Sequence, residues 1–116
     1  MEPNDRLPNA ERAVVPPEKV EVYLLNALHV QNKGKAQFFE LVGYSLSQPE
    51  RLAEDLKTIA KAGRVTNTVP TDDGMKYVLI GELTAPNRRE YSITSVWMIE
   101  KEQTAPRLIT AYPNQK

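Results

Sequence analysis

The chain has 116 residues, of which 41% are hydrophobic and 26% charged, values typical of one folded domain and not of a disordered or fibrous chain. It contains no cysteine and one histidine, which excludes disulfides, thiol catalysis and the common cysteine or multi-histidine metal sites. Fifteen basic side chains balance fifteen acidic ones, and this balance argues against broad electrostatic binding to nucleic acid. We therefore expect no metal and no cofactor.

Residues 1–15 are polar, contain two prolines and show no periodicity. We predict an extended lead-in over 1–15, followed by a single domain over 16–116. No apolar stretch is long enough to span a membrane, and the first residues lack the apolar centre of a signal peptide. A cytoplasmic protein without membrane contact is the expectation.

Apolar residues then recur at helical spacing in three segments. We predict helices that begin near Pro16, Lys33 and Ser47 and end near Leu28, Val42 and Gly63. Proline is tolerated in the first turn of a helix, where its missing N–H has no partner. Glycine is a common residue just after a helix ends.

After Gly63 the apolar period changes from 3.6 to 2, which is typical of strands. The predicted strands are Arg64–Thr71, Met75–Leu83, Glu90–Glu100 and Arg107–Tyr112. Every link between them is short, and parallel neighbours need long crossovers. The sequence therefore predicts an α+β fold with three N-terminal helices followed by a four-stranded antiparallel β-meander.

The first candidate site surrounds the lone histidine. His29 lies where the first helix is expected to end, and Lys33 and Lys35 follow on either side of a glycine. An imidazole, two ammonium groups and the start of the next helix suit a bound phosphate. The alternative is a solvated loop between two helices, with a histidine near a helix end.

The last strand carries the second candidate site. Simple alternation puts Leu108, Thr110 and Tyr112 on one face and Arg107, Ile109 and Ala111 on the other. Two hydroxyl groups on the same face of the strand can belong to one binding site. The alternative is that threonine and tyrosine are present because they favour strands.

Two weaker signals lie in turns. Asp72 and Asp73 are explained by the Asp-Gly hairpin turn that Gly74 completes. Arg88 and Arg89, at the tip of the next turn, can meet a phosphate, but exposed turns are commonly charged.

Several stretches resemble an uncharacterised bacterial family of domains of unknown function. These are Leu7–Ala10, Gly34–Glu40, Val96-Trp97 and Leu108–Pro113. Members of that family look like small stand-alone proteins and C-terminal modules of polymorphic toxins. A wider likeness is to the BECR-fold ribonuclease toxins (the barnase, EndoU, colicin D and RelE group), some of which close with a Thr-Ala-Tyr-Pro-like strand. This chain departs from EndoU-like enzymes in having one histidine where they use two.

The resemblance implies a metal-independent endoribonuclease of toxin type, acting on tRNA or mRNA and held in check by a cognate antitoxin or immunity protein. It implies that His29 is the general acid or base, that Lys33 or Lys35 stabilises the developing charge, and that Thr110 and Tyr112 position the phosphate. The implied substrate-binding residues are Thr94, Arg88, Arg89 and Arg107. A non-catalytic interaction module, or an antitoxin or accessory partner, is the alternative that the neutral charge favours. The oligomeric state stays open.

Overall fold

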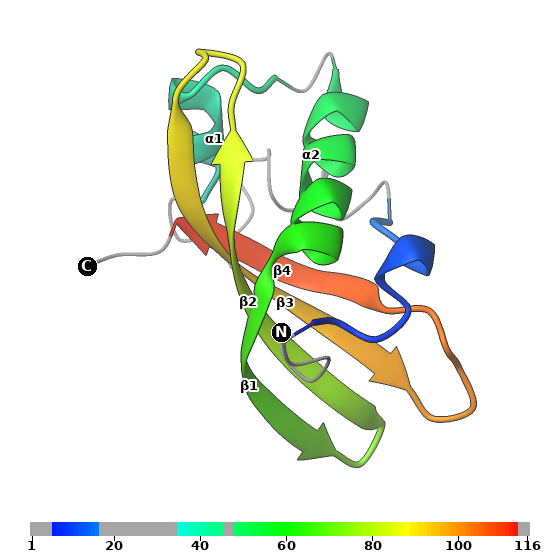
Figure 1. The fold of residues 1–116 in the computed structure, drawn as a ribbon. Coiled ribbons are helices and arrows are strands. Elements are labelled where there is room, and N and C mark those ends of the chain that lie inside the picture. The colour runs from blue at the N-terminus through cyan, green and yellow to red at the C-terminus, as the bar shows by residue number, and fades with distance from the viewer. Residues whose placement is uncertain (1–5, 17–34, 46–47, 114–116) are drawn as a thin grey trace.

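The computed structural model describes residues 6–16, 35–45 and 48–113 (Figure 1). In chain order its elements are the 3₁₀ turn η2 (Ala10–Arg12), the helices α1 (Lys35–Leu41) and α2 (Pro49–Ala62), and the strands β1 (Arg64–Thr71), β2 (Gly74–Thr84), β3 (Glu90–Glu100) and β4 (Arg107–Pro113).

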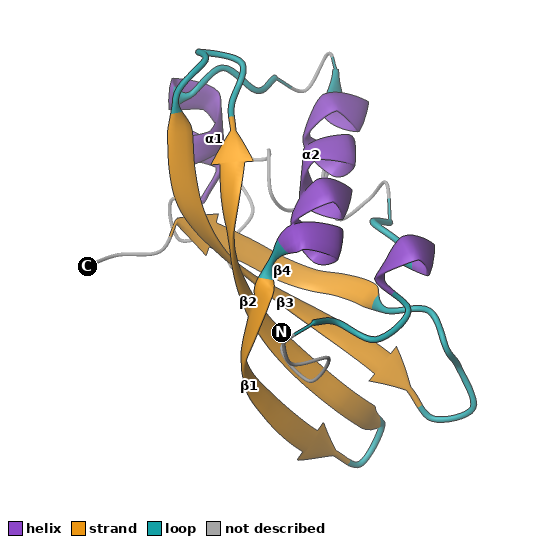
Figure 2. Ribbon diagram, in the orientation of Figure 1, coloured by secondary structure: helices purple, strands orange, loops and turns teal. Residues whose placement is uncertain are grey.

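The strands form one antiparallel sheet in the order β1-β2-β3-β4. The predicted α+β class and the four-stranded meander are confirmed. A two-residue loop closes the β1–β2 hairpin, where Thr71 pairs with Gly74. The Thr71 hydroxyl stabilises this turn because it accepts a hydrogen bond from the Gly74 N–H at 3.1 Å. The helices lie at one end of the twisted sheet, and the hairpin end of β1 and β2 extends beyond them (Figure 2).

The helical part differs from the prediction. Helix α2 has 14 residues, with Pro49 at its start and Gly63 as its C-cap, whereas α1 has only seven. The first predicted helix falls almost wholly outside the described residues. Within the described ranges there are thus two α-helices and a 3₁₀ turn, and not three helices before the sheet. The 3₁₀ turn was missed because it depends on one backbone angle, the left-handed φ of 57° at Asn9.

The core lies between the helices and one face of the sheet, called here the inner face. Strands β2, β3 and β4 contribute alternate side chains, and α2 contributes an apolar stripe. The largest fully buried side chains are Trp97, Phe39, Leu52, Leu56, Ile59, Leu79, Leu83, Ile93 and Leu108. The parity that put Ile93 and Trp97 in the core is confirmed.

Two further contacts tie the helical layer to the rest of the core. The ring of Phe38, on α1, meets the ring of Tyr91, on β3, edge-on at 5.5 Å between centroids. The Tyr44 hydroxyl donates a hydrogen bond of 2.6 Å to the carboxylate of Asp55 on α2. Burial, together with the hydrogen bond and the negative charge of Asp55, raises the pKa of Tyr44 well above its usual value, against a smaller opposing effect of Arg51. Tyr44 therefore stays protonated and acts as a structural link.

The N-terminal segment closes part of one sheet edge. Leu7 and Val15 are buried in the core. Val14 pairs with the start of β4, since its N–H donates to the Pro106 carbonyl at 2.8 Å and its carbonyl accepts from the Leu108 N–H at 3.0 Å.

Candidate functional site

The face of the sheet opposite the core, called here the outer face, gathers several of the predicted site residues. In the β3–β4 register Thr94 stands opposite Tyr112, and Val96 stands opposite Thr110. Thr94 is nearly buried at 7% exposure, whereas Tyr112 is 38% exposed. Residues directly opposite in an antiparallel pair have neighbouring side chains on the same face. The structure therefore brings these three hydroxyl-bearing residues together.

A β-bulge in β4 interrupts the strict alternation of faces that the sequence predicts for that strand. The register shifts between Val96 and Trp97, which pair with Thr110 and Leu108, and this leaves Ile109 without a partner on β3. A bulge inserts one residue and reverses the parity beyond it. Leu108 and Ala111 consequently both face the core at 0% exposure. The prediction that Leu108 shares a face with Thr110 and Tyr112 was wrong.

The same bulge adds Arg107 to the outer face. Arg107 pairs with Met98, which has the outward parity of Thr94 and Val96. Its guanidinium donates to the carboxylate of Glu100 at 3.1 Å, and both side chains remain partly exposed, at 39% and 45%. Because this ion pair lies at the surface, the Arg107 guanidinium remains accessible to an anionic ligand from solvent.

Of the other predicted site residues, the structure places Arg88 and Arg89 away from this cluster and does not describe the side chains of the rest. His29 and Lys33 lie outside the described residues, and Lys35 is the first residue of α1, with a side chain that is also outside the described part. Arg88 and Arg89 lie in the exposed β2–β3 turn, which is fixed by a 3.1 Å hydrogen bond from the Asn87 N–H to the Val42 carbonyl. At about 3.3 Å per residue, Arg89 is roughly 16 Å along β3 from Thr94.

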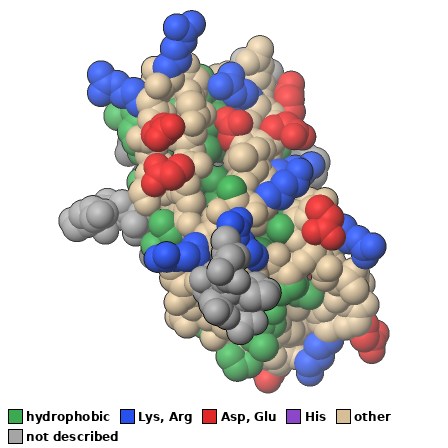
Figure 3. Space-filling view, viewed as in Figure 1, with side chains coloured by type: hydrophobic (Ala, Val, Ile, Leu, Met, Phe, Trp, Pro, Cys, Tyr) green, Lys and Arg blue, Asp and Glu red, His purple; other side chains and the backbone are tan. Residues whose placement is uncertain are grey.

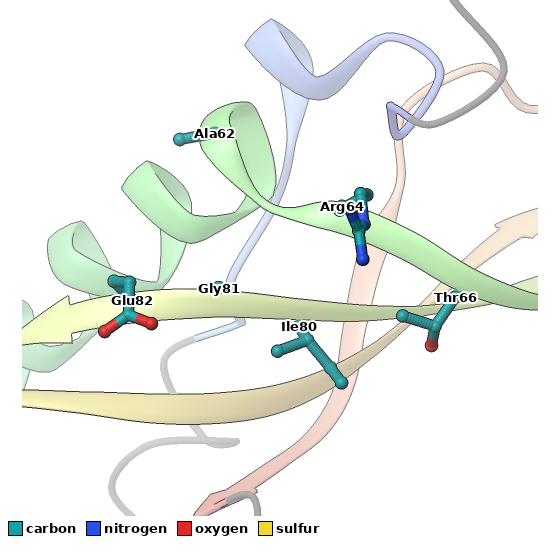
Figure 4. A pocket seen from close by; sticks show the side chains of 6 residues that line it. All are labelled: Ala62, Arg64, Thr66, Ile80, Gly81 and Glu82. Atoms are coloured by element: carbon teal, nitrogen blue, oxygen red, sulfur yellow. The ribbon is translucent and has the colours of Figure 1, made fainter. Parts of the chain in front are cut away.

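Arg64, the first residue of β1, is not among the site residues predicted from the sequence. It pairs with Ile80, which in turn pairs with Thr94, so one row across the sheet runs through Arg64, Ile80, Thr94 and Tyr112. Arg64 also lines a cavity of about 310 Å³ together with Ala62, Thr66, Ile80, Gly81 and Glu82. Figure 4 shows Arg64 and Glu82 on either side of Ile80. Arg64 directly follows Gly63, the predicted end of the third helix, and this position could have indicated the start of a strand. The row of the sheet that contains Arg64 could not be predicted, because it depends on a second bulge, between Val65 and Asn67.

The surface charge is mixed. Positive and negative side chains are interspersed over the face that Figure 3 shows, in agreement with the formal net charge of zero. Within the described ranges, no group of three or more His, Cys, Asp or Glu residues is arranged to hold a metal ion. Nor does that part of the chain include a helix with the length and apolar character needed to cross a membrane.

Comparison with known proteins gives a family and a fold. The family model described as "Domain of unknown function (DUF6883)" matches residues 6–115. No curated protein matches the chain significantly. Among solved structures, the chain is similar to a chain of the "Contact-dependent growth inhibition toxin - immunity protein complex from Klebsiella pneumoniae 342", with a TM-score of 0.69 and 15% sequence identity. The alignment covers 88% of this chain and 100% of that chain. At this identity the likeness shows a shared fold.

Proposed function

Because the chain belongs to the family of the domain of unknown function DUF6883, whose name gives no activity, we propose a function from its fold and its outer face: it is the ribonuclease toxin of a toxin–immunity system. The proposal of a toxin–immunity system is supported by the fold, which matches the whole of one chain from a toxin–immunity complex. A cognate immunity protein is then the expected partner.

The support for RNA as the substrate comes from the outer face. Thr110 and Tyr112 place hydroxyl-bearing side chains on one side of β3 and β4, beside the nearly buried Thr94, and Arg107 adds a cation to that side. Hydroxyls and a guanidinium suit a phosphodiester, because they donate hydrogen bonds to its oxygens as negative charge builds up.

The proposed reaction needs no metal. The ribose 2′-hydroxyl oxygen attacks the adjacent phosphorus, the bond to the 5′-oxygen breaks, and the products are a 2′,3′-cyclic phosphate and a 5′-hydroxyl. A base must remove the 2′-proton and an acid must protonate the leaving 5′-oxygen. The chain has one histidine, so His29 fills one of these roles and the Tyr112 hydroxyl fills the other. Lys33, Lys35 and Arg107 stabilise the negative charge on the non-bridging oxygens of the phosphorane.

The test is cleavage of RNA by the purified full chain. Total RNA and tRNA are incubated with the protein in EDTA, and the fragments are examined for cyclic phosphate ends. We expect cleavage, a loss of about 100-fold or more in His29→Ala, and a smaller loss in Tyr112→Phe. Tyr77→Phe is the matched control, because Tyr77 packs on the inner face. Intact RNA after incubation with the wild-type chain would overturn the ribonuclease proposal.

The second candidate is a non-catalytic partner, such as the immunity protein of a similar system. The mixed surface charge favours it (Figure 3), since ribonucleases gain from a basic excess. Expression in a bacterial host separates the two. A toxin stops growth and its His29→Ala variant does not, whereas a binding module leaves growth unchanged in both forms.

A further inference from the structure

The cavity of about 310 Å³ lies at the corner where α2 ends and β1 begins, against β2. Two glycines let this corner pack closely on β2. A Cβ atom added at Gly81 would lie 2.8 Å from Cγ2 of Ile59, and one added at Gly63 would lie 2.7 Å from the Ile59 carbonyl oxygen. Only glycine, which has no Cβ, allows so close an approach. Tightly packed backbone therefore forms the walls of the cavity, as in ligand sites that are formed before the ligand binds.

One cation and one anion line the cavity. Arg64 on β1 and Glu82 on β2 lie on either side of Ile80 (Figure 4). Arg64 pairs with Ile80, and Glu82 lies two positions further along β2, so the Cα atoms of the two charged residues are about 7–8 Å apart. Both residues are exposed, and among the described residues neither charged group has a hydrogen bond or an ion pair. The two charges are therefore available to a ligand that lies between them.

This pair of charges restricts the kind of ligand. Glu82 would repel a phosphate or a carboxylate, and Arg64 would repel an amine. A neutral group that has both hydrogen-bond acceptors and hydrogen-bond donors suits both side chains, and Ile80 adds an apolar surface for a flat ring. The cavity is also small, because ligand pockets range from about 300 to 1,000 Å³. It therefore suits a single nucleobase and not a longer stretch of nucleic acid.

We propose that this cavity binds a guanine base of the RNA substrate. The Arg64 guanidinium donates two hydrogen bonds, to O6 and N7 of guanine, and the Glu82 carboxylate accepts two, from N1–H and N2–H. Among the four RNA bases only guanine has two adjacent N–H donors on its pairing edge. In adenine, cytosine and uracil a carboxylate at that edge gains one hydrogen bond and faces the lone pair of a neighbouring acceptor.

The inference rests on the ribonuclease proposal, because it names the base beside the bond that is cleaved. One row of the sheet runs from Arg64 through Ile80 and Thr94 to Tyr112. Neighbouring strands lie about 4.8 Å apart, so Ile80 and Tyr112, which are two strands apart, are separated by about 10 Å across the outer face. A single nucleotide can therefore place its base in the cavity and its phosphate beside Tyr112.

The first test is a titration of the isotope-labelled full chain with the four ribonucleoside 3′-monophosphates, followed by NMR. The four probes share the same phosphate, so a difference in affinity reports the base alone. We expect guanosine 3′-monophosphate to bind about 10-fold or more tightly than the other three and to shift the amide signals of Ile80 and Glu82. Equal affinity for all four nucleotides, or signal shifts confined to residues away from the cavity, would overturn the proposal.

Two variants test the two charged side chains. Glu82→Gln should remove the preference for guanine, because a carboxamide accepts one of the two N–H groups and opposes the other with its own N–H. Arg64→Lys should weaken guanine binding although the charge is kept, because lysine lacks the planar fork that reaches two acceptors. Glu102→Gln is the matched control, since it makes the same change at an exposed position between β3 and β4, and it should bind as the wild type does. A guanine preference that survives in both Glu82→Gln and Arg64→Lys would contradict the assignment.

Mapping of RNA fragments separates this inference from the ribonuclease proposal. We expect the wild type to cut beside guanines and Glu82→Gln to cut without that preference. Intact RNA would overturn the ribonuclease proposal alone, because the titration is read without cleavage. Guanine-selective binding together with cuts that bear no relation to guanine would show that the cavity takes a free guanine nucleotide, and would overturn its assignment to the RNA substrate.

Discussion

The two faces of the sheet are built from alternate residues of the same strands, yet they differ in nearly every property. On the inner face Leu79, Ile93, Trp97 and Leu108 are at 0% exposure. On the outer face hydroxyl-bearing and charged residues alternate with partly buried apolar ones such as Ile80 and Val96, and Tyr112 is 38% exposed. Only Thr94 and Met98 are nearly buried there, at 7% each.

The side chains of the inner face stabilise the fold, whereas those of the outer face remain available to bind a ligand or to react. Burial of apolar area, worth about 25 cal/mol per Å², concentrates the stabilisation on the inner face. Substitutions on the outer face cost less, so polar groups can be collected there without weakening the core. A fold does not by itself set a function, so a fold shared at 15% identity leaves the activity to be argued from particular side chains.

Truncation of two adjacent residues of β2 compares the packing of the two faces directly. Leu79→Ala removes a fully buried side chain and should lower the free energy of unfolding by about 2–5 kcal/mol. Ile80→Ala, one residue on and facing outward, should cost less than half as much. Urea unfolding of both variants measures the difference. Equal losses would show that the outer face is packed as the inner one is.

Sequence reasoning succeeded for the inner face because its signal is periodic. The bounds of β1 and β3 were predicted without error, and those of β2 and β4 within one residue. Tyr91, Ile93 and Trp97 were placed by parity alone. A strand is recognised from the alternation of apolar and polar residues, and this alternation is clear wherever one face of the sheet is buried.

The outer face was predicted less well because two bulges set it. The bulge at Ile109 places Leu108 on the inner face and Arg107 on the outer face with Thr110. The bulge at Thr66 places Arg64 opposite Ile80. No glycine or proline marks either position, so no local pattern announced the change of parity. The proximity of His29 to this face stays a prediction, since residue 29 lies outside the described ranges.

A polar group inside the core gives the second test. Tyr44→Phe removes the hydroxyl that donates to Asp55 and leaves that carboxylate without it, which should cost about 1–2 kcal/mol. The loss should be larger than that of Thr68→Val, an exposed position on β1. Urea unfolding at neutral pH measures both.

The same residue predicts a pH dependence. The pKa of Tyr44 is raised in the folded state, whereas an unfolded tyrosine ionises near pH 10. Above about pH 10 the unfolded chain releases this proton and the folded chain keeps it, so the contribution is complete below that pH and is lost as the pH rises. The free energy of unfolding between pH 8 and 11 should fall more steeply in the wild type than in Tyr44→Phe. Parallel curves would show that Tyr44 ionises as freely when folded as when unfolded.

The smallest expected effect belongs to the ion pair of the outer face. Arg107 and Glu100 are 3.1 Å apart with 39% and 45% of their side chains exposed, and such surface pairs contribute about 0.2–1 kcal/mol. Arg107→Ala and Glu100→Ala, separately and together, should show a coupling within that range which shrinks in high salt, because ions screen exposed charges. RNA cleavage should nevertheless fall markedly in Arg107→Ala and stay close to the wild-type rate in Glu100→Ala. A coupling above about 2 kcal/mol would make this pair part of the framework, and the outer face would then be less open to functional change than its exposure indicates.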